Sequence, residues 1–178
     1  ISEFEKNKIV QRVHPCLVKK NSYIAKIDDV LNAVIIDGRP AGQTVVQGEG
    51  AGPKATTSAL VSDISSIMRG NIKLPFVVSH KKMKKMHFNN IDNKNFSVYL
   101  RLDVLDKHGV LSNITKIMSK NKVSIKRLIQ NPYKSKKFSS IVIITHKAKN
   151  VKLKKIINQL TQKNYILKKP KLIRIENI

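Results

Sequence analysis

The feature that most constrains the fold is a change of hydrophobic period within residues 96–175. From Phe96 to Val104 apolar and polar residues alternate, which is the period of two of a half-buried strand. From Val110 to Asn121 the apolar positions lie three or four residues apart, as in an amphipathic helix. The rest of this half predicts strands at 123–130 and 139–145, a helix along the stripe from Leu153 to Leu160, and a last strand at 165–175 in which Pro170 marks an edge position or a bulge. The order β-α-β-β-α-β predicts a ferredoxin-like domain, with four antiparallel strands under two helices.

The positive charge of the chain is concentrated in the same half. The 178 residues carry 35 Lys and Arg against 11 Asp and Glu, a net charge of +24. Residues 1–75 hold 10 basic and 7 acidic side chains, whereas residues 76–178 hold 25 and 4. A basic protein that binds nucleic acid or an anionic surface is therefore one reading. However, the lysines are scattered among strand and helix positions, and with 5% aromatic residues and no Trp the chain has few side chains on which bases could stack, so we favour a solvated basic face.

The organisation of the chain follows from where the periodicity stops. Residues 77–95 include a run of lysines between His80 and His87 and show no period, which predicts a basic linker between a first part, 1–76, and a second domain, 96–178. No apolar run approaches the ~18 residues that a membrane-spanning helix needs. The single cysteine, Cys16, excludes an internal disulfide, so we expect a reducing, cytoplasmic compartment. A start at Ile1 without an initiator Met suggests a fragment of a longer protein.

The first part contains a glycine-rich turn between a predicted hairpin and a helix. Residues 32–37 and 44–47 read as its two strands, and residues 54–69 have helical spacing. Between them lies Gly48-Glu49-Gly50-Ala51-Gly52-Pro53, where bare backbone N–H groups at a helix start could receive an anion. Pro53 breaks the usual dinucleotide-binding pattern, and no Gly-Lys-Ser/Thr follows. A purely structural turn therefore remains an open alternative.

Other polar residues of this part are expected to be structural. His14 lies between Val13 and Pro15 with no carboxylate or nucleophile at a telling spacing, and Cys16 has no metal-ligand or activating constellation. Thr56, Thr57 and Ser58 are expected to cap and pack the helix. No His is spaced with a second metal ligand, so we expect no metal site.

The string Leu105-Asp106-Lys107-His108-Gly109-Val110-Leu111-Ser112-Asn113-Ile114 at the first strand-to-helix junction resembles the ACT domain, a small-molecule sensor of amino-acid metabolism. The resemblance implies that Asp106 holds an α-ammonium group while Gly109 and the helix start approach a carboxylate. Its candidate effector residues are Asp106, Gly109, Val110 and Asn113. The alternative is that Asp106 only caps the helix and Gly109 only turns the chain. His108 stands where the family often has Pro.

A second resemblance covers the first part. Arg12-Val13-His14-Pro15, Asn32-Ala33-Val34, Gly48-Glu49-Gly50-Ala51-Gly52 and residues 55–64 occur in the order found at the end of the catalytic domain of homoserine dehydrogenase. Many bacterial members of that family append an ACT domain. The resemblance implies an α+β protein, the antiparallel-sheet part of that catalytic domain followed by a ferredoxin-like ACT domain.

The function implied is NAD(P)-dependent interconversion of L-homoserine and L-aspartate 4-semialdehyde, on the route to threonine and methionine. Gly50, Ala51 and Gly52 would then lie beside the nicotinamide, with NADP or NAD held mainly by an N-terminal domain that this chain lacks. No catalytic residue is expected here, so the chain alone should be inactive. The resemblance further implies threonine as an effector and a homodimer or homotetramer. A stand-alone amino-acid sensor remains an alternative.

Overall fold

The computed structural model describes residues 1–5, 7–71, 79–83, 85–132 and 137–178. The chain forms two compact units. Unit 1 combines residues 1–17 with 87–177, and unit 2 holds residues 18–86 together with Ile178. Residues 1–17 and 87–95, which the sequence assigns to the first part and to the linker, thus pack with the predicted ACT domain. Strand pairing that is distant in sequence accounts for this difference.

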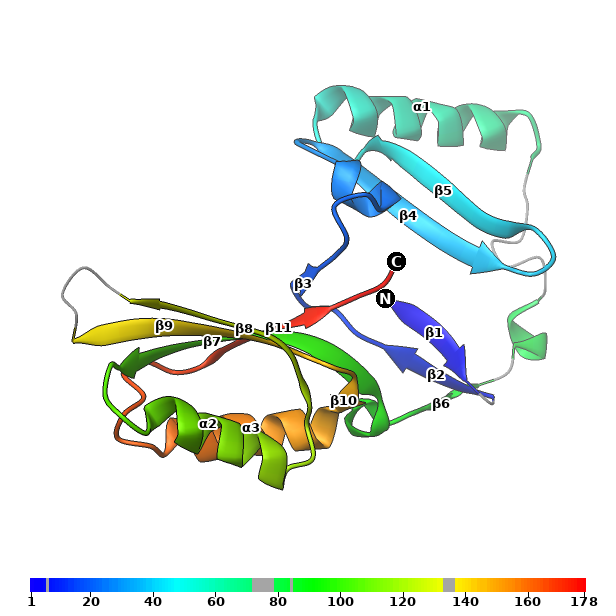
Figure 1. The fold of residues 1–178 in the computed structure, drawn as a ribbon. Coiled ribbons are helices and arrows are strands. Elements are labelled where there is room, and N and C mark those ends of the chain that lie inside the picture. The colour runs from blue at the N-terminus through cyan, green and yellow to red at the C-terminus, as the bar shows by residue number, and fades with distance from the viewer. Residues whose placement is uncertain (6, 72–78, 84, 133–136) are drawn as a thin grey trace. The chain divides into compact units, whose positions relative to one another are not determined.

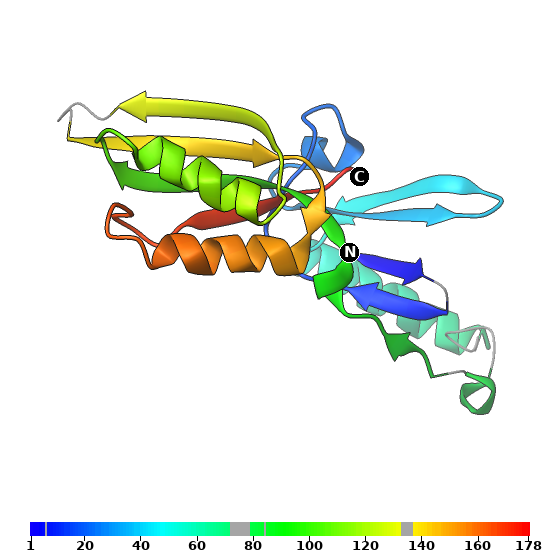
Figure 2. The same ribbon diagram turned by 60° about the horizontal axis from the view of Figure 1, so that its bottom comes forward.

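The main sheet of unit 1 has the predicted topology (Figures 1 and 2). Its strands are β7 (Asn95–Leu105), β8 (Ile125–Pro132), β9 (Phe138–Thr145) and β11 (Lys171–Ile175). They lie in the order β11-β7-β9-β8, every neighbour antiparallel. This is the arrangement that two crossing β-α-β units produce, and the α+β fold class is confirmed.

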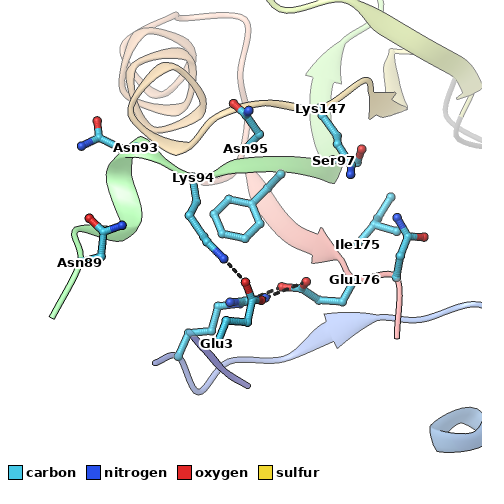
Figure 3. A pocket seen from close by; sticks show the side chains of 12 residues that line it. Glu3, Asn89, Asn93, Lys94, Asn95, Ser97, Lys147, Ile175 and Glu176 are labelled. Atoms are coloured by element: carbon cyan, nitrogen blue, oxygen red, sulfur yellow. Dashed lines mark hydrogen bonds and ion pairs between the residues drawn. The ribbon is translucent and has the colours of Figure 1, made fainter. Parts of the chain in front are cut away.

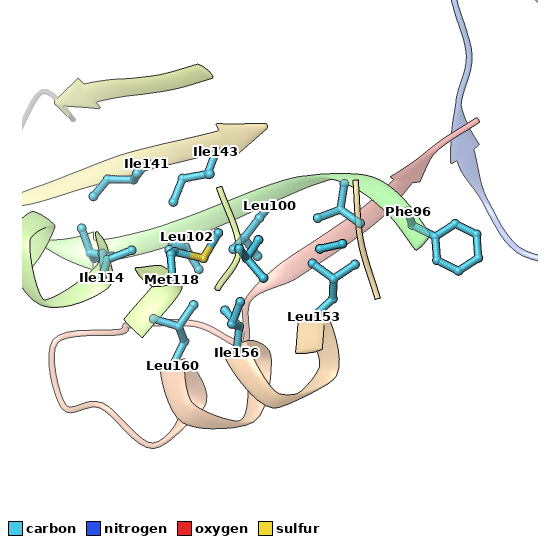
Figure 4. Close-up of a cluster of buried hydrophobic side chains, with 14 of the residues drawn as sticks. Phe96, Leu100, Leu102, Ile114, Met118, Ile141, Ile143, Leu153, Ile156 and Leu160 are labelled. Atoms are coloured by element: carbon cyan, nitrogen blue, oxygen red, sulfur yellow. The ribbon is translucent and has the colours of Figure 1, made fainter. Parts of the chain in front are cut away.

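Two helices cover one face of this sheet and close the core (Figure 4). They are α2 (Val110–Lys120) and α3 (Asn150–Thr161), which contact each other. The predicted stripes point inward: Ile114 and Leu160 are fully buried. They meet the inward positions of β7 and β9, such as Leu102 and Ile143. Because alternate strand residues and every third or fourth helix residue are apolar, one contiguous core forms.

The last strand is shorter than the sequence predicts. Residues 165–170 lie outside β11, apart from an isolated bridge between Val104 and Ile166. Pro170 is buried and directly precedes the strand, so it marks neither an edge position nor a bulge within it. At the other edge of the sheet, β8 continues to Pro132, two residues past the predicted end. The outermost position of β8 fits this, because proline is accepted where no hydrogen bond to a further strand is required.

The first residues of the chain add strands to unit 1 that the sequence does not predict. The strands β1 (Ser2–Glu5), β2 (Lys8–Gln11) and β6 (His87–Phe88) form a small sheet of their own. Strand β3 (Cys16–Leu17) pairs parallel to β11 and extends the main sheet. The remaining short elements of the unit are β10 (Ala148–Lys149), which pairs with β7, and the 3-10 turn η3 (Ile91–Asn93).

Unit 2 consists of the predicted hairpin and helix. Strands β4 (Leu31–Gly38) and β5 (Gly42–Glu49) pair along their whole length, and α1 (Pro53–Met68) follows. The short 3-10 turns η1 (Tyr23–Lys26) and η2 (His80–Lys82) complete the described part. Pro53 occupies the first turn of α1, and Gly70, at φ +71°, lies just past its end, as expected of helix boundaries. Among the described residues of unit 2 none is buried.

Candidate functional site

The glycine turn links the end of β5 to the start of α1 and lies on the surface of unit 2. Residues 48–52 are exposed, and a hydrogen bond of 3.2 Å from the Gly50 N–H to the carbonyl of Val30, the residue directly before β4, ties the turn to the start of the hairpin. The predicted cradle therefore exists as an open bend and is not buried in packed interior. Open backbone of this kind is accessible to a ligand.

The glycines of this turn are required for different reasons. Gly52 has φ +110° and ψ 155°, a backbone region that is essentially restricted to glycine. Space beyond its Cα is open, since among the described residues no atom outside Ala51, Gly52 and Pro53 lies within 4 Å of where a Cβ would be. At Gly50 a Cβ would instead overlap the side-chain amide of Asn32. Gly48 has neither constraint.

The start of α1 presents a positive end without an acidic side chain. Gly52 is its N-cap residue, and its carbonyl accepts hydrogen bonds from the Thr56 N–H at 3.1 Å and the Thr56 hydroxyl at 3.0 Å. The hydroxyl of Thr56 is thus engaged within the helix, which agrees with the expected structural role. The helix dipole and Lys54 in the first turn favour an anionic group next to the turn.

The predicted effector loop is formed by the junction of β7 and α2. Gly109 is the N-cap of α2 in the left-handed conformation, at φ +81°, and its Cβ position is open. Asp106 is exposed, and its Oδ1 accepts a long 3.4 Å hydrogen bond from the Gln130 amide. No side chain caps α2, so Asp106 does not serve as its cap. Asn113 is exposed on the first turn, whereas Val110 is buried in the core.

A second polar cluster, which the sequence does not predict, surrounds Arg12 (Figure 3). The Arg12 Nε and Nη2 atoms donate to the two Glu176 oxygens at 3.1 Å each, and Nη2 also donates to Glu3 at 2.6 Å. Lys94 forms an ion pair with the other Glu3 oxygen. The guanidinium lies 5.6 Å from the centre of the Phe96 ring. We call Arg12, Glu3, Glu176 and Lys94 the Arg12 cluster.

The Arg12 cluster is partly buried, and its hydrogen bonds lower the pKa of Glu3. Only 5% of the Arg12 side chain and 9% of the Glu176 side chain are exposed. Burial raises the pKa of Glu3, but hydrogen bonds from Lys94 and Arg12 outweigh it, so the pKa of Glu3 lies below its ordinary value. A polar pocket of about 420 Å³ opens beside the cluster and is lined by Glu3, Arg12, Lys94 and Glu176 together with residues such as Asn95 and Lys147.

His14 and Cys16 lie beside this cluster and show no catalytic arrangement. The Nε2 atom of His14 is 3.4 Å from Glu176. Burial lowers the pKa of His14, Arg174 adds to the effect, and Glu176 opposes it. Cys16 is a free, half-buried thiol in β3. Both positions agree with the expected structural roles.

Within the ranges that the structure describes, no three His, Cys, Asp or Glu side chains are grouped so that they could hold a metal ion. In the same ranges, no helix has the length and apolar character needed to cross a membrane.

Comparison with known protein families places both parts of the chain. Residues 2–65 match the family model for homoserine dehydrogenase, and residues 100–168 match that for an AHAS small subunit-like ACT domain. The homoserine dehydrogenase of Helicobacter pylori is 31% identical over 166 residues, which cover 93% of this chain and 39% of that protein. For Bacillus subtilis the identity is 27% over 180 residues, with coverage of 99% and 41%.

A solved structure shows the same likeness. The homoserine dehydrogenase from Thiobacillus denitrificans, 27% identical, covers 99% of this chain with a TM-score of 0.81, while 41% of that chain is matched. This chain therefore spans about two fifths of the length of its relatives. The two resemblances that the sequence predicts are confirmed, and the comparisons support them over the alternative of a nucleic-acid-binding protein.

Proposed function

We propose that this chain, which matches homoserine dehydrogenase over residues 2–65 and an ACT domain over residues 100–168, is the C-terminal part of a homoserine dehydrogenase. The complete enzyme would interconvert L-homoserine and L-aspartate 4-semialdehyde with NADP or NAD. The observation that carries the proposal is the match to such enzymes along almost the whole chain, 99% of it in one solved structure.

The residues of the glycine turn suit a role beside the cofactor. Gly50, Ala51 and Gly52 are exposed, and the open space beyond Gly52 leaves room for a flat ring against bare backbone. When bound, a nicotinamide cofactor supplies the hydride acceptor or donor. The contribution of this chain is a wall without side chains, together with a positive helix end that favours a nearby anionic group.

The exposed apolar surface of unit 2 supports the proposal that unit 2 is only part of a domain. The helical stripe of α1 is largely solvent-exposed: Leu60 by 58%, Ile64 by 56% and Met68 by 82%. On the hairpin, Val34 and Val46 are also more than half exposed. Faces of this size normally pack against other polypeptide. We propose that the part of the enzyme outside this chain covers them, that it carries the catalytic residues, and that the chain alone is inactive.

The second domain would sense an amino acid. Asp106 projects from an exposed loop and is not used as a helix cap, while Gly109 and the start of α2 leave backbone open for a carboxylate. Asn113 lies on the adjacent helical turn and Val110 anchors that turn in the core. We propose threonine as the effector, in a cytoplasmic homodimer or homotetramer.

The test is the activity of the complete enzyme. With L-aspartate 4-semialdehyde and reduced cofactor, the enzyme should form homoserine, and millimolar threonine should lower the rate. The variant Asp106→Asn should weaken the threonine effect, while Asp63→Asn, an exposed substitution on α1, should not. If homoserine formation is absent, the proposed function is wrong. If the activity is present but threonine has no effect, only the regulatory role is lost.

A further inference from the structure

The segment that the enzyme family model claims is divided between the two units. Residues 2–65 match that model, yet residues 1–17 pack with the ACT part and the chain enters unit 2 only at Val18. We call residues 87–177 of unit 1 the ACT unit and residues 2–65 the enzyme segment. The ACT unit thus directly contacts the beginning of the enzyme segment. The contacts that hold it are therefore candidates for passing information from one part to the other.

Backbone pairing supplies the first of these contacts. Strand β3 pairs with β11, with Cys16 opposite Arg174 and Leu17 opposite Ile175. The Glu176 N–H donates to the Leu17 carbonyl at 2.9 Å. A two-residue strand contributes few hydrogen bonds, so it is not expected to hold the segment alone.

The Arg12 cluster supplies the stronger contact. Arg12 belongs to the enzyme segment and Glu176 to the ACT unit. The two side chains form an ion pair with two hydrogen bonds, and both are almost completely buried. Removing one member would leave the other charge buried without its partner, which makes the contact close to all-or-none. Arg12 also faces the ring of Phe96, which β7 contributes.

Strand β7 links this cluster to the effector loop. Lys94 immediately precedes the strand, Phe96 lies near its start, and the loop with Asp106 and Gly109 follows its end. As a central strand paired on both sides, β7 is a rigid element. A change at the loop can therefore reach Arg12 through a single packed strand.

We propose that the Arg12 cluster is the latch by which the ACT unit holds the segment 1–17 and passes its ligand state to the enzyme part. Arg12 is a positioning residue in this account and touches no reactant. The regulatory consequence rests on the proposed function, whereas the latch itself can be tested on the 178-residue chain.

The first experiment measures amide hydrogen exchange of the chain. Arg12→Met and Glu176→Gln should each speed exchange of the Glu176 amide on the order of 100-fold, while amides of the buried core strand β9 stay protected. Arg12→Lys, which keeps a positive charge beside Glu3 and Glu176 but cannot form the two-point contact, should recover part of the protection lost in Arg12→Met. Lys154→Met, which removes the exposed 2.6 Å pair to Asp92, is the matched control and should change little.

Unchanged exchange in Arg12→Met, or an Arg12→Lys variant no better protected than Arg12→Met, would overturn the latch. Loss of protection throughout β9 would show that Arg12 only supports the fold, and would also overturn it. None of these outcomes depends on whether the enzyme is a dehydrogenase.

The second experiment uses the complete enzyme. Arg12→Met should keep basal turnover and still bind effector in calorimetry, but inhibition should fall by at least half and effector affinity should no longer depend on bound cofactor. Intact inhibition in a variant with fast Glu176 exchange would refute the coupling. A wild-type enzyme without dehydrogenase activity would instead refute the proposed function and leave the exchange result standing.

Discussion

Replacing the glycines of the turn one at a time separates backbone strain from contact with the cofactor. Gly52 is held at φ +110° and ψ 155°, so Gly52→Ala forces an L-residue into a region that costs about 1–3 kcal/mol. No atom of the chain would obstruct the new methyl group. If the free enzyme relaxes this strain by moving the turn, cofactor binding must restore it, which weakens affinity roughly five- to 150-fold.

The assay is the Michaelis constant for the cofactor in the complete enzyme, together with the cofactor dissociation constant from fluorescence. Gly48→Ala is the matched control, because Gly48 lies at the end of β5, next to the turn, with an open Cβ position and a φ that other residues adopt. It should leave both constants unchanged. Gly50→Ala should give an intermediate effect, since Asn32 must move aside. Equal constants for Gly52→Ala and Gly48→Ala would refute the placement of the turn beside the cofactor.

Three further predictions concern unit 1. Ile114→Ala removes a fully buried side chain and should lower the free energy of unfolding by about 2–5 kcal/mol in urea titrations. The exposed Lys116→Ala is the control and should change it by less than about 0.5 kcal/mol. Equal losses in the two variants would contradict the core described here. Gly109→Ala introduces no clash but places alanine at φ +81°, so thermal unfolding should report a loss of about 1–2 kcal/mol, and no loss would refute the left-handed turn. Burial lowers the pKa of His14 in the folded chain below 6.5, so the unfolded chain binds the proton more tightly. The contribution of His14 to the free energy of unfolding is therefore complete above pH 6.5 and is lost as the pH falls through the folded-state pKa. Urea titrations at several pH values should show a weaker pH dependence in His14→Gln.

The ferredoxin-like fold could be predicted because its signals are local. Each strand and helix of β7 to α3 carries its own period in sequence, and the Gly109 turn marks the junction between two of them. The predicted last strand is too long because apolar residues from Tyr165 onward suggest a strand, but only residues 171–175 pair with β7, and of these only Arg174 and Ile175 also pair with β3. Of the segment between the strands predicted at 123–130 and 139–145, residues 133–136 lie outside the described residues.

The docking of residues 1–17 could not be predicted because nothing local indicates it. Arg12 and Glu176 are 164 positions apart, and the two residues of β3 are too few to show a period. The motif around His14 indicates a structural role for this segment, but it does not indicate that Glu176 is the partner of Arg12. The helical spacing of α1 likewise predicts the helix correctly, but not that its apolar stripe is exposed in this chain.

The glycine turn shows how far sequence can define a site. The order of glycines predicts a bare turn before a helix, and the backbone angles of Gly52 agree with it. This chain spans about two fifths of the length of its relatives. In the proposed function, the rest of the enzyme completes the cofactor site beside this turn.

The most direct test is to rebuild the enzyme from two parts. The part of the proposed enzyme that this chain does not span would be produced separately and mixed with this chain, and complex formation followed by size-exclusion chromatography. The account predicts that homoserine forms from L-aspartate 4-semialdehyde and reduced cofactor only when both parts are present. A stable complex of the two parts that forms no homoserine would contradict it.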